Sequence, residues 1–379
     1  MNEVKVYNTI FEVEKNLWDS LTENNVFMCY EWLKTVENTL IPPVKPHYIM
    51  ILDQNKLLAA SVCYYQSKNK NGASLDNILL GKLKKIRWIK KLSFLPAVIC
   101  NSKKGYGTHC IFSHEIEQNQ IIELQNQLIE IIEKIASANK ASICFPNVTN
   151  HESLLLNALK KKGYCKTKGT PYTYMDIIWS SFQDYKKCIS KKYPQMRKSI
   201  QREINKNKKS GVVIKQLSNI NGHQIRLYEL LKMNHKKYNS GIFPFNTDYI
   251  EQVKENFGDD SIIYISVKEE NITGVNIELR KGTEAVISNV GIDHKHAQND
   301  LTYFNIVFYE PIRNAMLCGL KRLYCGNGLY KTKVRRGYKV NETYLFYKSN
   351  YKIYSFIIRL WFLFHHWLMT KRLSYLSTL

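Results

Sequence analysis

One order of elements occurs twice along the chain, and this repeat limits the possible folds more than any other feature of the sequence. Each copy has an apolar stripe at helical spacing, a short apolar run, a basic-Gly-Tyr tripeptide and a further strand-like segment. The first copy comprises Ile121 to Ile135, Ala141 to Phe145, Lys162-Gly163-Tyr164 and Tyr172 to Trp179; the second comprises Leu301 to Ala315, Leu323 to Cys325, Arg336-Gly337-Tyr338 and Thr343 to Tyr347.

Strand-like segments separated by turn signals precede each copy. Those of the first half are His47 to Asp53 and Leu57 to Tyr65, and those of the second half are Ile262 to Val267, Gly274 to Glu278 and Ala285 to Asp293. The sequence therefore predicts an α/β protein of two tandem lobes, each a mixed, mostly antiparallel sheet flanked by helices. We place the lobes at residues 1–179 and 180–349, followed by an apolar segment, 350–379. Pro311 lies inside the second helical stripe, where we expect a kink or break after a cap at Asn299-Asp300.

Composition points to an anionic partner. Lys and Arg exceed Asp and Glu by 55 − 32 = 23 in 379 residues, which favours RNA, phosphorylated precursors or an acidic membrane surface, although lysine-rich background usage gives the same excess. The nine cysteines have no CxxC spacing and are typical of reduced, buried thiols. We expect a cytoplasmic protein, because the first residues do not form a signal peptide. We expect no metal site, because the His and Cys residues do not have the spacing of metal ligands.

The order of these elements resembles the GNAT acyltransferase fold, and its doubling resembles the FemAB-like group that includes the Fem-type peptidyltransferases. Four segments support the resemblance: Phe27 to Glu37 with Glu31-Trp32-Leu33, Tyr193 to Gly211, Tyr303 to Pro311, and Lys333 to Gly337. The resemblance implies an acyltransferase that moves an aminoacyl or acyl group from an activated donor to an amine of a cell-envelope, peptidoglycan or natural-product precursor.

The segment before the second helical stripe decides between donors. A GNAT protein that binds acyl-CoA usually has a glycine-rich loop here, because glycine lets backbone N–H groups approach the pyrophosphate. The equivalent stretch of this chain, His294 to Asp300, contains no glycine. Aminoacyl-tRNA, the donor that the resemblance to Fem ligases implies, is therefore favoured over acyl-CoA, and no tightly bound cofactor is expected.

The GNAT resemblance places the reacting carbonyl at the end of the strand Ala285 to Asp293. Asp293, His294 and Tyr303 are our catalytic candidates, with His294 as the acceptor of the amine proton because its ordinary pKa lies near neutrality. The alternative interpretation of Asp293-His294 is a solvated turn.

Two basic clusters are candidate substrate-binding sites. In the segment from Lys186 to Lys209, Met196, Ile200 and Ile204 form an apolar seam at helical spacing. The basic residues of this segment suit contacts with phosphates, and the alternative interpretation is a solvated helix face. The second cluster comprises the basic residues that follow the Gly326-Asn327-Gly328 turn. The alternative interpretation of Arg336 is a structural one, in which it only donates hydrogen bonds to strand carbonyls. The substrate-binding candidates are Arg197, Lys198, Arg202, Asn327, Tyr330, Lys331, Lys333 and Arg336.

Two further segments combine apolar and basic residues. Lys82 to Lys91 alternates basic and apolar side chains, and Tyr354 to Met369 is rich in aromatic residues but too short to span a bilayer. Residues 354–369 form either a helix at the inner membrane surface or a helix docked on the first lobe. Two non-enzymatic functions also fit the sequence: a catalytically inactive basic module that binds RNA, and a scaffold on an anionic membrane surface.

Overall fold

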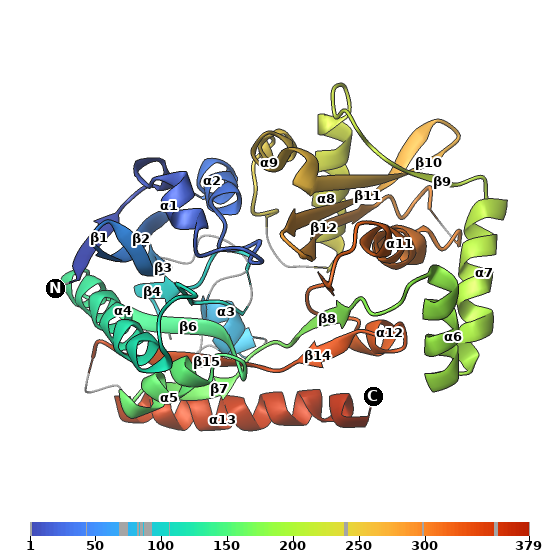
Figure 1. The fold of residues 1–379 in the computed structure, drawn as a ribbon. Helices are drawn as coiled ribbons and strands as arrows, with labels where there is room; N and C mark the ends of the chain where they lie inside the picture. The colour runs from blue at the N-terminus through green and yellow to red at the C-terminus, as the bar shows by residue number, and fades with distance from the viewer. Residues whose placement is uncertain are drawn as a thin grey trace. The chain divides into compact units, whose positions relative to one another are not determined.

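The computed structural model describes residues 2–42, 44–67, 75–81, 83, 86, 93–105, 107–238, 242–297, 299–351 and 355–378. They form two compact units, one of residues 1–171 and 342–378 and one of residues 172–341 (Figure 1). Most of the predicted run from Lys82 to Lys91 lies outside the described residues.

The first unit is built on one mixed sheet. Its strands are β1 (Glu3–Tyr7), β2 (Lys45–Asp53), β3 (Lys56–Gln66), β4 (Ala97–Cys100), β5 (Cys110–Phe112), β6 (Ser142–Thr149), β7 (Cys165–Lys168) and β15 (Thr343–Lys348). They follow the order β1-β2-β3-β4-β6-β15-β7, with β5 beside β3, and β4 and β6 are parallel. The helices of this unit are α1 (Lys15–Asp19), α2 (Tyr30–Thr39), α3 (Leu75–Leu80), α4 (Gln118–Ala138), α5 (Ser153–Lys161) and α13 (Ser355–Leu373).

The second unit repeats this arrangement. Its strands are β8 (Tyr172–Asp176), β9 (Val213–Gln216), β10 (Ser261–Lys268), β11 (Asn271–Lys281), β12 (Glu284–Ile292), β13 (Arg322–Tyr324) and β14 (Lys339–Asn341), in the order β14-β8-β13-β12-β11-β10-β9. The helices are α6 (Phe182–Lys192), α7 (Gln195–Lys209), α8 (Gln224–Tyr238), α9 (Tyr249–Phe257), α10 (Thr302–Phe304), α11 (Glu310–Leu317) and α12 (Tyr330–Val334). The predicted α/β class with two GNAT-like lobes is confirmed.

The closing strands are exchanged between the two sheets, which differs from the predicted boundaries at 179/180 and 349/350. β8 follows the first repeat in sequence but pairs with β13 and β14 of the second sheet. β15 follows the second repeat but lies between β6 and β7 of the first sheet. The chain therefore passes between the units near Pro171 and again near Glu342. The alternation of side chains identifies a strand without identifying its neighbour, so the sequence gives no sign of this exchange.

The predicted break in the second helical stripe is confirmed. Residues 305–309 form a π-helical turn between α10 and α11, and Pro311 lies in the first turn of α11, where a missing N–H is tolerated. The N-cap of α10 is Leu301 rather than the predicted Asn299-Asp300, although Asp300, one residue earlier, accepts a hydrogen bond from the backbone N–H of Thr302 at 2.9 Å. In the first unit, α4 is one continuous helix whose buried residues include Leu124, Leu128 and Ile132.

Helix α8 packs on β12 at unusually short range, and this contact sets the position of the site described below. Gly291 of β12 lies against the backbone of α8: a Cβ atom at this position would be 2.5 Å from the carbonyl carbon of Leu230 and 2.7 Å from the amide nitrogen of Leu231. Neither neighbour can move without moving the helix. Glycine is therefore required here by a close backbone approach.

We predict that Gly291→Ala lowers the free energy of unfolding by about 1–3 kcal/mol, because the added methyl group forces α8 away from β12. Thermal or urea unfolding followed by circular dichroism measures the change. Gly163→Ala is the control, since its added carbon meets nothing within 4 Å and only its positive φ of 77° opposes the change. A loss at Gly291 no larger than the loss at Gly163 contradicts the prediction.

Candidate functional site

In the second unit, β12 separates from its parallel neighbour β13. The two strands pair only at Glu284–Val286 and Arg322–Tyr324, while β12 continues to Ile292. Opposite β11, the register shifts so that Ser288 has no partner, which is a β-bulge. Beyond Val286, the β12 edge that faced β13 has no strand neighbour among the described residues. This edge offers backbone N–H groups to a bound carbonyl.

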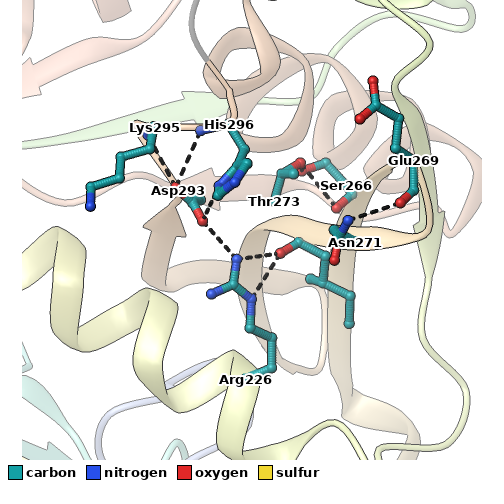
Figure 2. A network of polar contacts seen from close by, with 9 residues as sticks. Arg226, Ser266, Glu269, Asn271, Thr273, Asp293, Lys295 and His296 are labelled. Atoms are coloured by element: carbon teal, nitrogen blue, oxygen red, sulfur yellow. Dashed lines mark hydrogen bonds and ion pairs between the residues drawn. The ribbon is translucent and has the colours of Figure 1, made fainter.

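Asp293 organises the turn that follows β12, as Figure 2 shows. One carboxylate oxygen accepts from the backbone N–H groups of Lys295 and His296 at 3.0 and 3.3 Å. The other faces a guanidinium nitrogen of Arg226 at 2.8 Å and Nδ1 of His296 at 2.9 Å. Burial alone raises the pKa of Asp293, but the bonds from Arg226, His296 and the two backbone N–H groups outweigh it and hold the pKa well below its ordinary value. Asp293 is therefore a fixed, ionised carboxylate that orients the turn.

Arg226 joins this turn to helix α8. Its Nε and one terminal nitrogen donate to the backbone carbonyl of Ile272 at 3.0 and 2.9 Å, and the same terminal nitrogen contacts Asp293. The guanidinium thus fixes α8, β11 and the end of β12 together.

His294 lies next to this fixed carboxylate and has different properties. Its Nε2 atom is buried and has no hydrogen-bond partner among the described residues. Its ring packs edge-on against Tyr238, the last residue of α8, with centroids 5.6 Å apart. Burial and the charge of Lys237 lower the pKa of His294, against the opposing effect of Asp293. At neutral pH the imidazole is therefore uncharged, and one of its two ring nitrogens carries no proton and can accept one.

Tyr303 enters the same region from α10. Its pKa is raised, first by burial and then by Cys325, while Arg336 opposes the shift and Tyr238 adds to it. Tyr303 is thus a neutral phenol, able to donate a hydrogen bond, and its electrostatic neighbours come from the ends of both β13 and α8. Burial likewise raises the pKa of the Cys325 thiol, which leaves it protonated and a poor nucleophile.

The predicted donor loop begins its helix without glycine. Asn299 and Leu301 adopt left-handed backbone conformations, with φ of 59° and 61°, where glycine is the usual residue. Asn207 of α7 donates to the carbonyl of Asp300 at 3.1 Å and to the hydroxyl of Thr302 at 3.0 Å. The loop is therefore fixed to α7 by a buried amide.

Lys333 is turned into the interior, where 3% of the residue is exposed. Its ammonium donates to the backbone carbonyls of Cys325, Gly326 and Asn327, the last at 3.1 Å. These carbonyls form the turn at the end of β13. The predicted substrate-binding role of Lys333 needs correction on physical grounds: all three donors of its ammonium are used in holding this turn.

Arg336 is also buried, and it forms an ion pair with Glu203 of α7. One guanidinium nitrogen contacts both carboxylate oxygens at 2.8 and 2.7 Å, Nε donates to the Tyr309 hydroxyl at 3.2 Å, and the remaining nitrogen donates to the Thr332 carbonyl at 2.9 Å. The Tyr309 hydroxyl in turn bonds Glu203. The guanidinium lies over Phe304, 4.4 Å from the ring centroid. Arg336 therefore holds the core together, through Glu203, Tyr309 and a carbonyl of α12 rather than through the strand carbonyls that the structural alternative named.

Helix α7 presents opposite chemistry on its two faces. Its buried side is formed by Met196, Ile200, Glu203 and Asn207, which confirms the predicted apolar seam at Met196 and Ile200. Its other side exposes Arg197, Lys198 and Arg202, for which no ion pair is found among the described residues. Glu203, the one acidic residue of α7, is buried, so the exposed face carries basic and neutral polar residues and no carboxylate. Helix α6 packs on α7 and ends in Lys191 and Lys192.

The equivalent region of the first unit is filled by a histidine. His109 is fully buried, with Nδ1 2.7 Å from a carboxylate oxygen of Glu152 and Nε2 2.7 Å from the carbonyl of Pro146 on β6. Two acceptors require both ring nitrogens to donate, so His109 is an imidazolium. Burial lowers its pKa, but Glu152 and Pro146 outweigh burial and raise it.

The structure divides the predicted residues into three groups. Asp293 and His294 lie in the turn after β12, and Tyr303 is linked to His294 through Tyr238, which packs on the His294 ring and, behind the effect of burial, raises the pKa of Tyr303. Arg197, Lys198, Arg202, Asn327 and Lys331 are exposed, whereas Tyr330, Lys333 and Arg336 are buried. Sequence reasoning missed Arg226, Tyr238, Glu203 and Tyr309. A single signal was present for Glu203, which is the one acidic residue in an otherwise basic helix.

No group of three or more His, Cys, Asp and Glu side chains suited to a metal ion is found in the part of the chain that the structure describes.

Comparison with known proteins agrees with this architecture. A FemAB-like family model, described as peptidoglycan biosynthesis/recognition, matches residues 9–363. The structure is similar to FemX, with 12% identity, a TM-score of 0.58 and coverage of 94% of this chain and 99% of that one. L-PGS from Bacillus licheniformis has 11% identity and a TM-score of 0.51, covering 80% and 86% of the two chains.

A conserved protein of unknown function from Bacteroides thetaiotaomicron has 11% identity and a TM-score of 0.55, covering 91% of this chain and all (100%) of that one. At these identities the likeness concerns the fold. No curated protein matches the sequence.

We predict that Arg336→Met lowers the free energy of unfolding by about 3–5 kcal/mol, because Glu203 is left as a buried carboxylate without its cation. Adding Glu203→Leu should recover most of the loss, since the double variant buries no charge. Arg322→Met is the control: its pair with Asp176 is partly exposed and should contribute at most about 1 kcal/mol. Urea unfolding of the wild type and these three variants measures the changes, and a double variant no more stable than Arg336→Met contradicts a coupled pair.

Proposed function

Because the chain belongs to the FemAB-like family, we propose that it is an acyltransferase whose second unit moves an aminoacyl group from aminoacyl-tRNA to an amine of a cell-envelope precursor. One observation chiefly supports this proposal. At the end of β12, a strand edge without a strand neighbour lies next to a neutral histidine, His294, whose Nε2 has no hydrogen-bond partner among the described residues. The same scaffold in the first unit has a buried imidazolium instead.

The proposed reaction is direct attack of the amine nitrogen on the ester carbonyl of the donor. A C–N bond forms, the C–O ester bond breaks, and the ribose hydroxyl leaves with a proton. His294 accepts the proton that the amine loses, for which its lowered pKa and free Nε2 suit it. Backbone N–H groups along the open edge of β12 stabilise the oxyanion, and Tyr303, a neutral phenol, supplies a further donor or protonates the leaving oxygen.

Asp293 positions His294 and does not take the proton. Its carboxylate already accepts four hydrogen bonds, and its strongly lowered pKa makes it a weak base. Arg226 extends this support to α8, whose close contact with Gly291 keeps the turn in register with β12.

The tRNA donor is supported by charge and by the loop before α10. The exposed face of α7 places Arg197, Lys198 and Arg202 without competing carboxylates on the same helix face, as contacts to a phosphate backbone require. The loop from His294 to Asp300 uses non-glycine residues in left-handed conformations, so side chains stand where acyl-CoA binders keep bare backbone. An aminoacyl-tRNA donor fits a reaction in the cytoplasm, and the family's description, peptidoglycan biosynthesis/recognition, supports a cell-envelope precursor as the acceptor.

We predict that His294→Ala lowers the turnover of aminoacyl transfer by about 10²-fold or more, because the amine proton loses its acceptor. The wild-type rate should fall on the acid side only below about pH 6.5, the ordinary pKa of histidine, because the lowered pKa keeps His294 unprotonated down to that range. Transfer of a radiolabelled amino acid measures both. The control is His114→Ala, which replaces an exposed histidine of the first unit. An unchanged rate in His294→Ala removes His294 from the mechanism.

We predict that tRNA, and not CoA, raises the melting temperature of the protein, since only a ligand of the native state stabilises it. Arg197→Gln, Lys198→Gln and Arg202→Gln together should weaken tRNA binding and reduce the slope of log K against log salt by about one for each lost phosphate contact. The control combines Lys134→Gln, Lys140→Gln and Lys215→Gln, which are exposed elsewhere and change the net charge equally. Stabilisation by acetyl-CoA alone contradicts the donor assignment, whereas tRNA binding without transfer to any amine favours the RNA-binding alternative.

A further inference from the structure

Helix α13 carries apolar side chains both on the side that packs on the first unit and on the opposite, exposed side. It spans Ser355–Leu373 and packs along β7 of the first unit (Figure 1). A helix that buries one face against its own protein ordinarily exposes polar residues on the other. This helix does not, and its outer face requires an explanation.

The inner face is docked on the first unit. Phe362 is 2% exposed and joins a core with Phe94, Leu345 and Tyr347, while Ile358 and Trp361 pack at its edge. One turn further, Nδ1 of His365 lies 2.9 Å from the hydroxyl of Thr167 on β7. The predicted docked alternative for residues 354–369 therefore holds for this face, and the orientation of the helix about its own axis is fixed by these contacts.

The outer face exposes large apolar side chains in a continuous stripe. Phe356, Leu360, Leu363 and Trp367 follow helical spacing on one line and are 68%, 52%, 68% and 56% exposed. Ile357 and Phe364, at 55% and 43%, widen the stripe on one side. This set, which we call the outer stripe, is a contiguous apolar surface of the kind that marks an interaction site.

The charged residues of α13 itself are all basic, namely Arg359, Lys371 and Arg372. Lys371 continues the line of the stripe, with its ammonium 5.4 Å from the Trp367 ring centroid. On the neighbouring strand β7, Lys166 and Lys168 lie close enough to His366 to lower its pKa, behind the effect of burial. Lys168 also pairs with Glu342 at 3.2 Å, so the border of the apolar surface is mainly basic and includes one carboxylate.

We propose that the outer stripe of α13 docks the protein onto the surface of a bilayer that contains anionic phospholipid. Apolar side chains enter the boundary between headgroups and acyl chains, and Arg359, Lys371 and Arg372 contact the phosphates. A second copy of the chain is a poorer occupant, because a symmetric interface would place the same cations opposite each other without a carboxylate between them.

The helix lies along the membrane and does not cross it. Its 19 residues extend about 28 Å, but one side is covered by the first unit and Arg359 interrupts the apolar sequence. No helix in the described parts of the chain has the length and apolar character that a membrane crossing requires. This docking is independent of the proposed acyl transfer, since it concerns binding alone.

Flotation of the full-length protein with vesicles tests the proposal. At about 0.15 M salt, vesicles of phosphatidylglycerol and phosphatidylcholine should bind the protein at least about tenfold more tightly than vesicles of phosphatidylcholine alone. Leu360→Gln, Leu363→Gln and Trp367→Gln together should weaken this binding at least about tenfold. Lys371→Gln with Arg372→Gln should weaken binding to the anionic vesicles and leave binding to the neutral ones unchanged.

The matched control replaces three equally exposed apolar residues that lie elsewhere, Phe11→Gln, Ile178→Gln and Leu317→Gln, and should bind as the wild type does. All variants should keep the wild-type melting temperature, because every replaced side chain is exposed. Equal binding by the stripe variant and the wild type overturns the proposal, as does failure of the wild type to bind anionic vesicles. A dimer in analytical ultracentrifugation that only the stripe variant dissociates also overturns it and assigns the face to self-association.

Discussion

The second unit depends on a charge pair buried in its core. Glu203 comes from α7, Arg336 from the turn after α12, and Tyr309 from the π-helical turn that precedes α11. A buried pair of this kind is tolerated only when nearly every donor and acceptor is matched, and here the aromatic rings of Phe304 and Phe308 cover the guanidinium as well. The pair thereby fixes three segments that are distant in sequence.

Its effect on the site is indirect. Because Glu203 points inward, the outward surface of α7 carries basic residues and no carboxylate, and Asn207 on the inner side secures the loop after β12. Because Arg336 is held, Lys333 one turn earlier reaches the carbonyls at the end of β13. Asn207 and Lys333 therefore act on the site without contacting it: Asn207 holds the loop after β12, and Lys333 holds the turn after β13.

Much of the fold was predictable from local pattern. The strands at 45–53, 56–66, 261–268 and 284–292 and the interruption before Pro311 follow from alternation and from the chemistry of proline. The exchange of β8 and β15 was not predictable, because pairing partners depend on contacts between segments far apart in the chain. For the site, the sequence singled out Asp293 and His294 at the end of β12. It could not show that Lys333 and Arg336 are buried, because a basic residue in a motif looks the same whether it faces solvent or buried carbonyl and carboxylate groups. Arg226 and Tyr238 lie on a helix that no motif marks.

The two units show how one scaffold supports different chemistry through a single histidine environment. In the first, Glu152 and a strand carbonyl face the two nitrogens of His109, and a ring with two acceptors must keep its second proton. In the second, the neighbouring carboxylate is neutralised by Arg226, Lys237 adds a repulsive charge, and one nitrogen of His294 faces no partner among the described residues. Both histidines lie beside an acidic residue, so proximity to a carboxylate does not decide protonation. What decides it is whether that carboxylate is available to the imidazole or already engaged by arginine, and this difference is the basis on which we propose His294 as the proton acceptor.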